Sequence, residues 1–88
     1  MVESPASATE LLRSSKEVLR QLADANHDQQ VPASDQRVAE HAIAVGIAEL
    51  AGEPRPADVD EDPTRPILAR DMLITVDLVL RAIDAANG

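Results

Sequence analysis

The sequence predicts an all-α fold, a compact three-helix bundle formed by all 88 residues as one domain. Three segments repeat their apolar residues with a period near 3.6, and turn-forming residues separate these segments. Leu, Ile and Val make up about a quarter of the chain, which is enough for a compact core. Because Ala supplies 15 of the 39 apolar residues, the elements must approach closely to bury enough area, and this favours helices.

The first helix is expected at about residues 5–24. Ser7 and Glu10 have the spacing of a capping box, in which the Ser hydroxyl accepts a hydrogen bond from a backbone N–H near the helix start. The dipeptide Ser4-Pro5 offers an alternative start one turn earlier. The apolar residues share one face with Ser15, and charged residues occupy the opposite face. These apolar residues are Leu11, Leu12, Val18, Leu19 and Leu22.

The second helix is expected at about residues 34–51, with Ser34 as its N-cap. Its end is marked by Gly52, which can adopt the left-handed conformation, and by Pro54, which prevents continuation. Gly46 lies in the apolar face and predicts a close helix crossing, and the alternative is a tolerated imperfection of the helix. That face comprises Ala39, Ile43, Gly46, Ile47 and Leu50, widened by Val38, Ala42 and Val45.

A connector rich in proline and acidic residues is expected at 53–65. Five carboxylates lie between residues 53 and 62, and four of the six prolines are Pro54, Pro56, Pro63 and Pro66. Such a segment is not helical throughout, because proline removes hydrogen-bond donors and the carboxylates repel one another. We therefore expect an extended, stiff connector, with one short extra helix inside it as the alternative.

The third helix, at about residues 66–86, has two apolar faces. A broad face contains Leu68, Met72, Leu73, Val76, Val79, Leu80 and Ile83, and a narrower face on the far side contains Ile67, Ile74, Leu78 and Ala85. In a three-helix monomer one of these faces points at water, and an exposed aliphatic patch marks an interface. We therefore predict that the narrower face forms a homodimer or binds a partner helix. The alternative is a central helix that its own chain covers on both sides.

The charge balance excludes several classes of partner. A formal net charge of −8 repels phosphate backbones and anionic lipid headgroups, and no aromatic side chain is present to stack on a base. The N-terminal residues do not resemble a secretion signal, and no stretch approaches the ~18 apolar residues of a membrane span. We expect a cytoplasmic protein that binds neither nucleic acid nor membranes.

The segment 24–35 carries oxygen-bearing side chains at alternate positions. Numbered as a twelve-residue loop, it has Asp24, Asn26, Asp28 and Asp35 at positions one, three, five and twelve, and an apolar Val31 at position eight. This pattern resembles the calcium loop of the EF-hand family, because calcium takes six to eight oxygen ligands from such a spacing. Asp at position twelve makes the segment more similar to a dockerin module than to calmodulin. The ligands that the resemblance implies are Asp24, Asn26, Asp28, Gln30 and Asp35.

The pattern returns thirty-six residues further along the chain. The residues Asp60, Asp62, Thr64, Ile67 and Asp71 repeat positions one, three, five, eight and twelve. Paired loops at about this separation are typical of the EF-hand family. At position six, where the family has Gly, this chain has Gln29 and Arg65. If the resemblance holds, it implies that calcium is a cofactor and that the first loop is the one that binds it.

No constellation of residues typical of an enzyme is present. His27 and His41 lack ligand-spaced partners and are predicted to be surface residues. Ser34 is placed like the phosphopantetheine-bearing Ser of acyl carrier proteins, but the Asp-Ser-Leu of that family is missing, so a helix cap is the better interpretation. The chain is expected to be a non-enzymatic protein–protein interaction module without a cofactor. An EF-hand-like calcium-binding module is the alternative.

Overall fold

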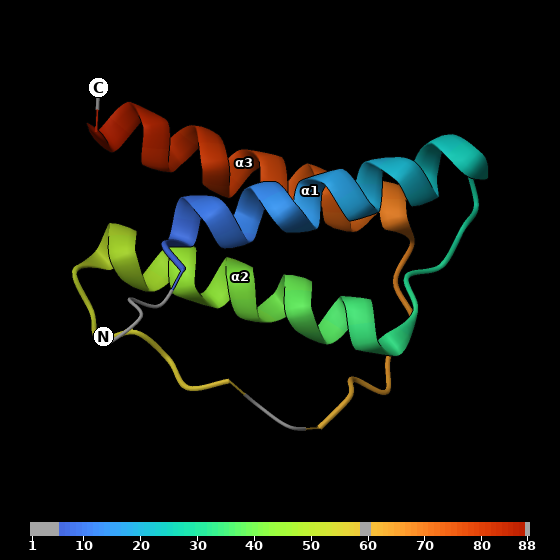
Figure 1. Cartoon of the computed structure of the whole chain (residues 1–88), viewed down its shortest axis with the longest axis horizontal. Coiled ribbons are helices and arrows are strands. Elements are labelled where there is room, and N and C mark those ends of the chain that lie inside the picture. The colour runs from blue at the N-terminus through green and yellow to red at the C-terminus, as the bar shows by residue number, and fades with distance from the viewer. Residues whose placement is uncertain (1–5, 59–60, 88) are drawn as a thin grey trace, which may run out of the picture.

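The protein is a three-helix bundle in which each helix contacts both others. The computed structural model describes residues 6–58 and 61–87. Helix α1 spans Ala8–Ala25, α2 spans Ala33–Ala51, and α3 spans Ala69–Asn87. Figure 1 shows that α1 runs in the direction opposite to α2 and α3. The predicted all-α bundle is confirmed.

Helix α1 begins as its capping residue predicts. The Glu10 N–H donates to Ser7 Oγ at 3.2 Å, so the helix starts at Ala8. The expected start at residue 5 is outside the described residues, and the capped start is the one the structure has. The buried face is Ala8, Leu12, Ser15 and Leu19, whereas Val18 is 42% exposed and lies at the edge of that face.

Helix α2 starts one residue earlier than expected, and the predicted Ser34 cap is wrong. Pro32 precedes the helix with an extended backbone, and its carbonyl oxygen accepts from the Gln36 N–H at 2.8 Å. The fixed φ of proline is suited to this position, so Ser34 lies inside the first turn. At the other end Gly52 adopts φ 69° and closes the helix as predicted.

The inner face of α2 is built from small residues. Its buried residues are Gln36, Ala39, Ala42, Val45, Gly46 and Ala48. Val38, Ile47 and Leu50, which the sequence projection placed on this face, are 52%, 52% and 41% exposed. A Cβ at Gly46 would lie 2.7 Å from Val79 Cγ1 and 3.0 Å from Leu12 Cδ1. The predicted close crossing at Gly46 is therefore confirmed, and it involves both α1 and α3.

A short antiparallel pairing joins the segments that precede α2 and α3. The Val31 N–H donates to the Ile67 carbonyl oxygen at 2.9 Å, and the Ala69 N–H donates to the Gln29 carbonyl oxygen at 2.8 Å. This pairing holds residues 67–68 in an extended form, so α3 begins at Ala69 and not at residue 66 as expected. The described parts of the connector, 53–58 and 61–65, contain no helix.

The core is aliphatic and lies where the three helices meet. Helix α3 contributes Met72, Val76, Leu80 and Ile83, all from the predicted broad face, together with Ala69. Ile67, predicted on the narrower face, is half-buried and packs against the core, because it belongs to the extended segment before α3. It is therefore wrongly assigned to that face.

Gly46→Val is expected to lower the free energy of unfolding by about 1–3 kcal/mol, because the added atoms overlap with Val79 and Leu12. Urea denaturation followed by far-ultraviolet circular dichroism measures this change. Ala44→Val, at an exposed position of the same helix, is the control and should cost about 0.5 kcal/mol. Equal stability of the two variants would contradict the close crossing.

Candidate functional site

The outer face of α3 exposes two large aliphatic side chains. Ile74 is 60% exposed and Leu78 is 61% exposed, and they lie one helical turn apart. Ala85 continues this face and is also exposed. We call these three residues the α3 outer face. Three of the four predicted interface residues therefore lie together at the surface, and the described chain leaves them uncovered, which contradicts the alternative of a central helix covered on both sides.

Charged residues border the α3 outer face on one side. The Lys16 Nζ lies 2.9 Å from an Asp77 carboxylate oxygen, and the Arg81 Nε lies 2.9 Å from the other oxygen. The hydrogen bond from Lys16, aided by the charges of Arg81 and Lys16, lowers the pKa of Asp77 against the opposing effect of burial. The ionised carboxylate thus links α3 to α1 at neutral pH. This stabilisation is lost as the pH falls through the lowered pKa.

Helix α2 also exposes apolar side chains, which the sequence analysis missed. Val38, Ile47 and Leu50 lie outside the core because the smaller residues of α2 occupy the crossing. A signal was available, since apolar residues surround most of this helix. Projection alone assigned the larger side chains to the inside, where there is no room for them.

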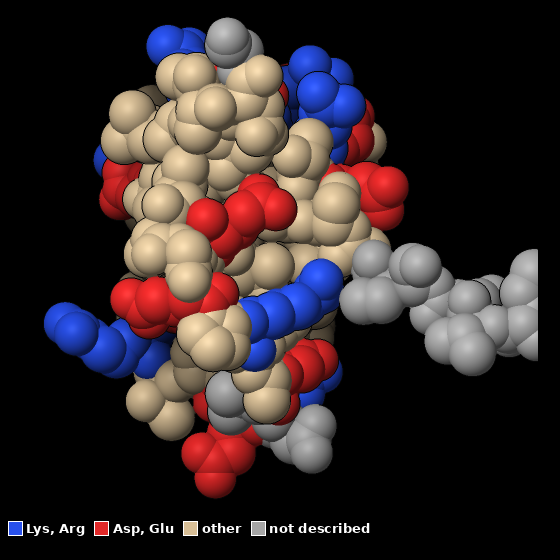
Figure 2. All heavy atoms as spheres, turned by 90° about the vertical axis from the view of Figure 1, so that its left-hand side faces the viewer, with Lys and Arg blue, Asp and Glu red and all other residues tan. Residues whose placement is uncertain are grey.

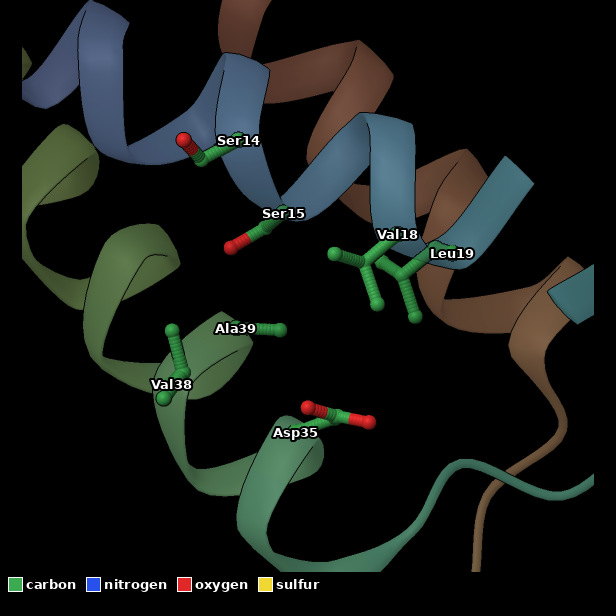
Figure 3. A pocket seen from close by; sticks show the side chains of 7 residues that line it. All are labelled: Ser14, Ser15, Val18, Leu19, Asp35, Val38 and Ala39. Atoms are coloured by element: carbon green, nitrogen blue, oxygen red, sulfur yellow. The ribbon is translucent and has the colours of Figure 1, made fainter. Parts of the chain in front are cut away.

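A groove between α1 and α2 forms a cavity of about 80 Å³. Its lining residues, labelled in Figure 3, are Ser14, Ser15, Val18 and Leu19 from α1 and Asp35, Val38 and Ala39 from α2. We call it the α1–α2 groove. The Ser15 hydroxyl is buried and makes no hydrogen bond within the described residues. The sequence placed Ser15 on the apolar face of the first helix, but gave no sign of a cavity beside it.

The predicted calcium ligands of the first loop do not converge on one point. Asp24 belongs to the last turn of α1, and Asn26 caps that helix, with its Oδ1 accepting from the Asp28 N–H at 3.1 Å. The Asp28 carboxylate lies 3.8 Å from the Arg70 guanidinium. Asp35 lines the α1–α2 groove.

The backbone of Gln30, the remaining predicted ligand, is engaged in the pairing with Leu68, and its carbonyl oxygen accepts from the Gln29 side chain at 2.9 Å. Within residues 6–58 and 61–87, no group of three or more His, Asp or Glu side chains is arranged to hold a metal ion. In the second predicted loop Asp60 lies outside the described residues, and the Asp62 carboxylate lies 3.6 Å from Arg37.

The two predicted loops nevertheless match in their backbone at positions eight and ten. The Val31–Ile67 hydrogen bond joins the residues numbered eight in both loops. Both following helices begin at position ten, at Ala33 and Ala69. The thirty-six-residue spacing noted in the sequence is therefore reproduced in the structure at these points.

Charge is mixed on the end of the bundle where α1 begins and where α2 and α3 finish. Figure 2 shows acidic and basic side chains there, separated by uncharged surface. His27 lies at the opposite end of α1, exposed and in contact with Arg70. None of the described helices combines the length and apolarity that a bilayer crossing requires.

The fold and these surfaces define a small acidic three-helix bundle with exposed aliphatic faces. In comparisons with protein-family models, curated proteins and solved structures, no significant match to this chain was found.

Ser15→Ala is expected to raise the free energy of unfolding by about 1 kcal/mol more than Ser14→Ala does, because only Ser15 has a buried hydroxyl without a partner. Both substitutions gain the same helix propensity, so the exposed Ser14 is a matched control. Thermal unfolding of both variants measures the difference. A Ser15→Ala protein less stable than Ser14→Ala would mean that the hydroxyl is well hydrogen-bonded.

Proposed function

We propose that this protein is a non-enzymatic interaction module that self-associates through the α3 outer face. The observation that carries the proposal is the exposure of Ile74 and Leu78, 60% and 61%, on a helix whose opposite face is fully used by the core. Two large aliphatic side chains one turn apart provide the anchors that a helix-to-helix interface uses. The same face on a second copy is self-complementary in a two-fold dimer.

The surroundings of this face support a second copy as the partner. Ala85 is small, so it lets two helices approach closely near the end of the face. Asp77 and Arg81 carry opposite charges beside it, so two copies meet with both signs present along the border. A partner helix from another protein, with its own aliphatic stripe, is the other outcome that the experiment below distinguishes.

Ile74→Asp is expected to convert a dimer into a monomer at micromolar protein concentration, because each copy then places a carboxylate in the apolar contact. Light scattering coupled to size-exclusion chromatography measures the mass. Ile47→Asp is the control, since it makes the same change at a residue of similar exposure, 52%, on another helix. It should leave the mass unchanged.

Two results would contradict self-association through the α3 outer face. One is a parent protein that stays monomeric across the micromolar range. In that case the α3 outer face would bind a helix of another protein and not a second copy. The other is a dimer that Ile47→Asp disrupts and Ile74→Asp does not, which would place the interface on α2. Circular dichroism of each variant establishes that the bundle is still folded.

A calcium-binding module is the second candidate function, and the match of the two loops at positions eight and ten favours it. The hydrogen bond between Val31 and Ile67 and the matching starts of α2 and α3 give the two segments the same backbone relation to their helices. Calcium would have to displace Arg70 from Asp28 and draw Asp35 out of the α1–α2 groove. We therefore place this candidate second.

Calcium at a hundred times its dissociation constant is expected to raise the free energy of unfolding by about 2.7 kcal/mol if the first loop binds it. Thermal unfolding of metal-free protein with and without millimolar calcium measures the change. The double variant Asp24→Asn with Asp28→Asn should lose the effect, whereas Asp84→Asn, an exposed carboxylate on α3, should keep it. An unchanged unfolding temperature in calcium would contradict this candidate.

A further inference from the structure

The large and the small side chains of the α3 outer face lie at different ends of it. Asp71, Leu78 and Ala85 are exposed and are spaced seven residues apart, so they lie in line along the helix. Ile74 lies beside this row in its N-terminal half, and the exposed Ala82 lies beside it in its C-terminal half. The two large aliphatic side chains are therefore at the centre and toward the N-terminal end, and the alanines follow them.

The edge of α3 that faces α1 carries charges of alternating sign. The Asp77 carboxylate accepts from Lys16 of α1 at 2.9 Å, which places this edge beside α1. Arg70 and Asp84 lie seven residues before and after Asp77, so they share its edge. Arg81, whose Nε lies 2.9 Å from Asp77, completes it. From the N-terminal to the C-terminal end of α3 the signs are positive, negative, positive and negative.

The edge of α3 that faces α2 is built from uncharged residues. Val79 belongs to this edge, because its side chain approaches Gly46 of α2. Thr75, Ala82 and Ala86 lie on the same side of the helix, at multiples of three or four residues from Val79. The two edges of the α3 outer face therefore differ in charge.

A two-fold axis can relate two copies of α3 in two ways. If the axis is parallel to the helices, the helices are parallel, each residue in the middle of the face meets its own copy, and the charged edge meets the uncharged edge. If the axis is perpendicular to the helices, they are antiparallel, and each edge meets its own copy in reverse order. The order of charges and sizes along α3 thus distinguishes the two arrangements.

We propose that a second copy packs antiparallel on the α3 outer face, about a two-fold axis at Leu78. Asp71 then lies opposite Ala85 of the second copy. Ile74 lies opposite Ala82 of the second copy, so a large side chain meets a small one. This inference rests on the proposed self-association, and it adds the orientation of the second copy and the residues that meet.

Charge complementarity supports the antiparallel orientation. The reversed order brings Arg70 near Asp84 of the second copy, and the symmetry makes this pair twice. Arg70 contacts His27 and lies 3.8 Å from Asp28, both through Nη1, and a guanidinium has further N–H donors for another carboxylate. Near the axis the two Asp77 carboxylates approach each other, but each is already paired with two cations.

Other arrangements fit the same face less well. Parallel helices would place Asp71 against Asp71 of the second copy, and like charges that face each other across an interface are unfavourable. The antiparallel arrangement separates these two carboxylates by about 21 Å along the helices, at 1.5 Å per residue. A helix of another protein would not bring the reversed copy of the charges, and the experiment treats it as an outcome that overturns the proposal.

The test is disulfide cross-linking of full-length variants, because the chain has no cysteine of its own. Asp71→Cys and Ala85→Cys are mixed in equal amounts and oxidised, and mass spectrometry without reduction identifies each dimer by its mass. We expect the mixed disulfide to be the main product, because only that pair lies within reach of a disulfide. Asp71→Cys mixed with Ala44→Cys, exposed on α2, is the control for chance collisions and should give little product.

Charge variants test the pair of Arg70 with Asp84 in solution. Asp84→Arg should raise the dissociation constant of the dimer about fivefold, because two arginines then meet at each end of the interface. The control Asp24→Arg makes the same change of net charge at an exposed position of α1, and it should not weaken the dimer. Adding Arg70→Asp to Asp84→Arg should restore the dissociation constant. Light scattering over a dilution series measures these constants, and circular dichroism establishes that each variant is folded.

Four outcomes would overturn the proposal. Disulfides of each variant with itself, in a protein that light scattering shows to be a dimer, would mean parallel helices and would leave self-association in place. A dimer without any of these disulfides would have its interface elsewhere. Equal effects of Asp84→Arg and Asp24→Arg would mean that only the overall charge matters. A monomeric parent protein would overturn both the orientation and the self-association on which it rests, and would leave the face to a helix of another protein.

Discussion

Close approach of the three helices is the constraint on which the other features of this structure depend. The chain has no aromatic side chain, so the core is built from aliphatic groups that fill little volume each. Gly46 lies where a Cβ would overlap with Val79 of α3 and crowd Leu12 of α1. Ala39 and Ala42 lie on the same buried face. Because small residues occupy the crossing, larger side chains of α2 are left at the surface.

The exposed surfaces follow from this arrangement. Ile47 and Leu50 are outside because alanine and glycine occupy most of the buried face of α2. The α1–α2 groove exists because alanine on α2 faces serine on α1, and these two small side chains leave space between the helices (Figure 3). The small residues on the buried face of α2 therefore leave larger apolar side chains of that helix exposed for interactions.

Much of the fold could be predicted from the sequence, because local signals determine it. The Ser7 cap, the Gly52 terminator and the periodic faces of α1 and α3 all depend on residues within one or two turns. The Ser34 cap and the start of α3 were wrongly predicted, because local signals do not determine them. Their positions depend on the pairing of residues 29–31 with 67–69, a contact between distant segments that periodicity does not contain.

The candidate sites show the same division. Exposure of Ile74 and Leu78 was predicted from the two apolar faces of this helix, against the alternative of a helix that its own chain covers on both sides. The isolation of Ser15 could not be predicted, because it depends on which residue of α2 lies opposite. Likewise the spacing of Asp24, Asp28 and Asp35 was visible in the sequence, but their divergence depends on the path of the loop between α1 and α2.

The pairing before α2 and α3 also has a consequence for how the chain reaches its fold. Helices α1 and α2 are neighbours in sequence, so they can meet through a short turn, whereas α3 must return across the connector to reach both. The free-energy cost of closing such a loop, which comes from lost chain entropy, grows only slowly with loop length, by about 0.6 kcal/mol for each doubling. Prolines reduce the number of conformations that the open connector can sample. The proline-rich connector thus lowers the entropic cost of bringing α3 back against α1 and α2. Once α3 has returned, the backbone hydrogen bonds of Ile67 with Val31 and of Ala69 with Gln29 fix the register of the two paired segments.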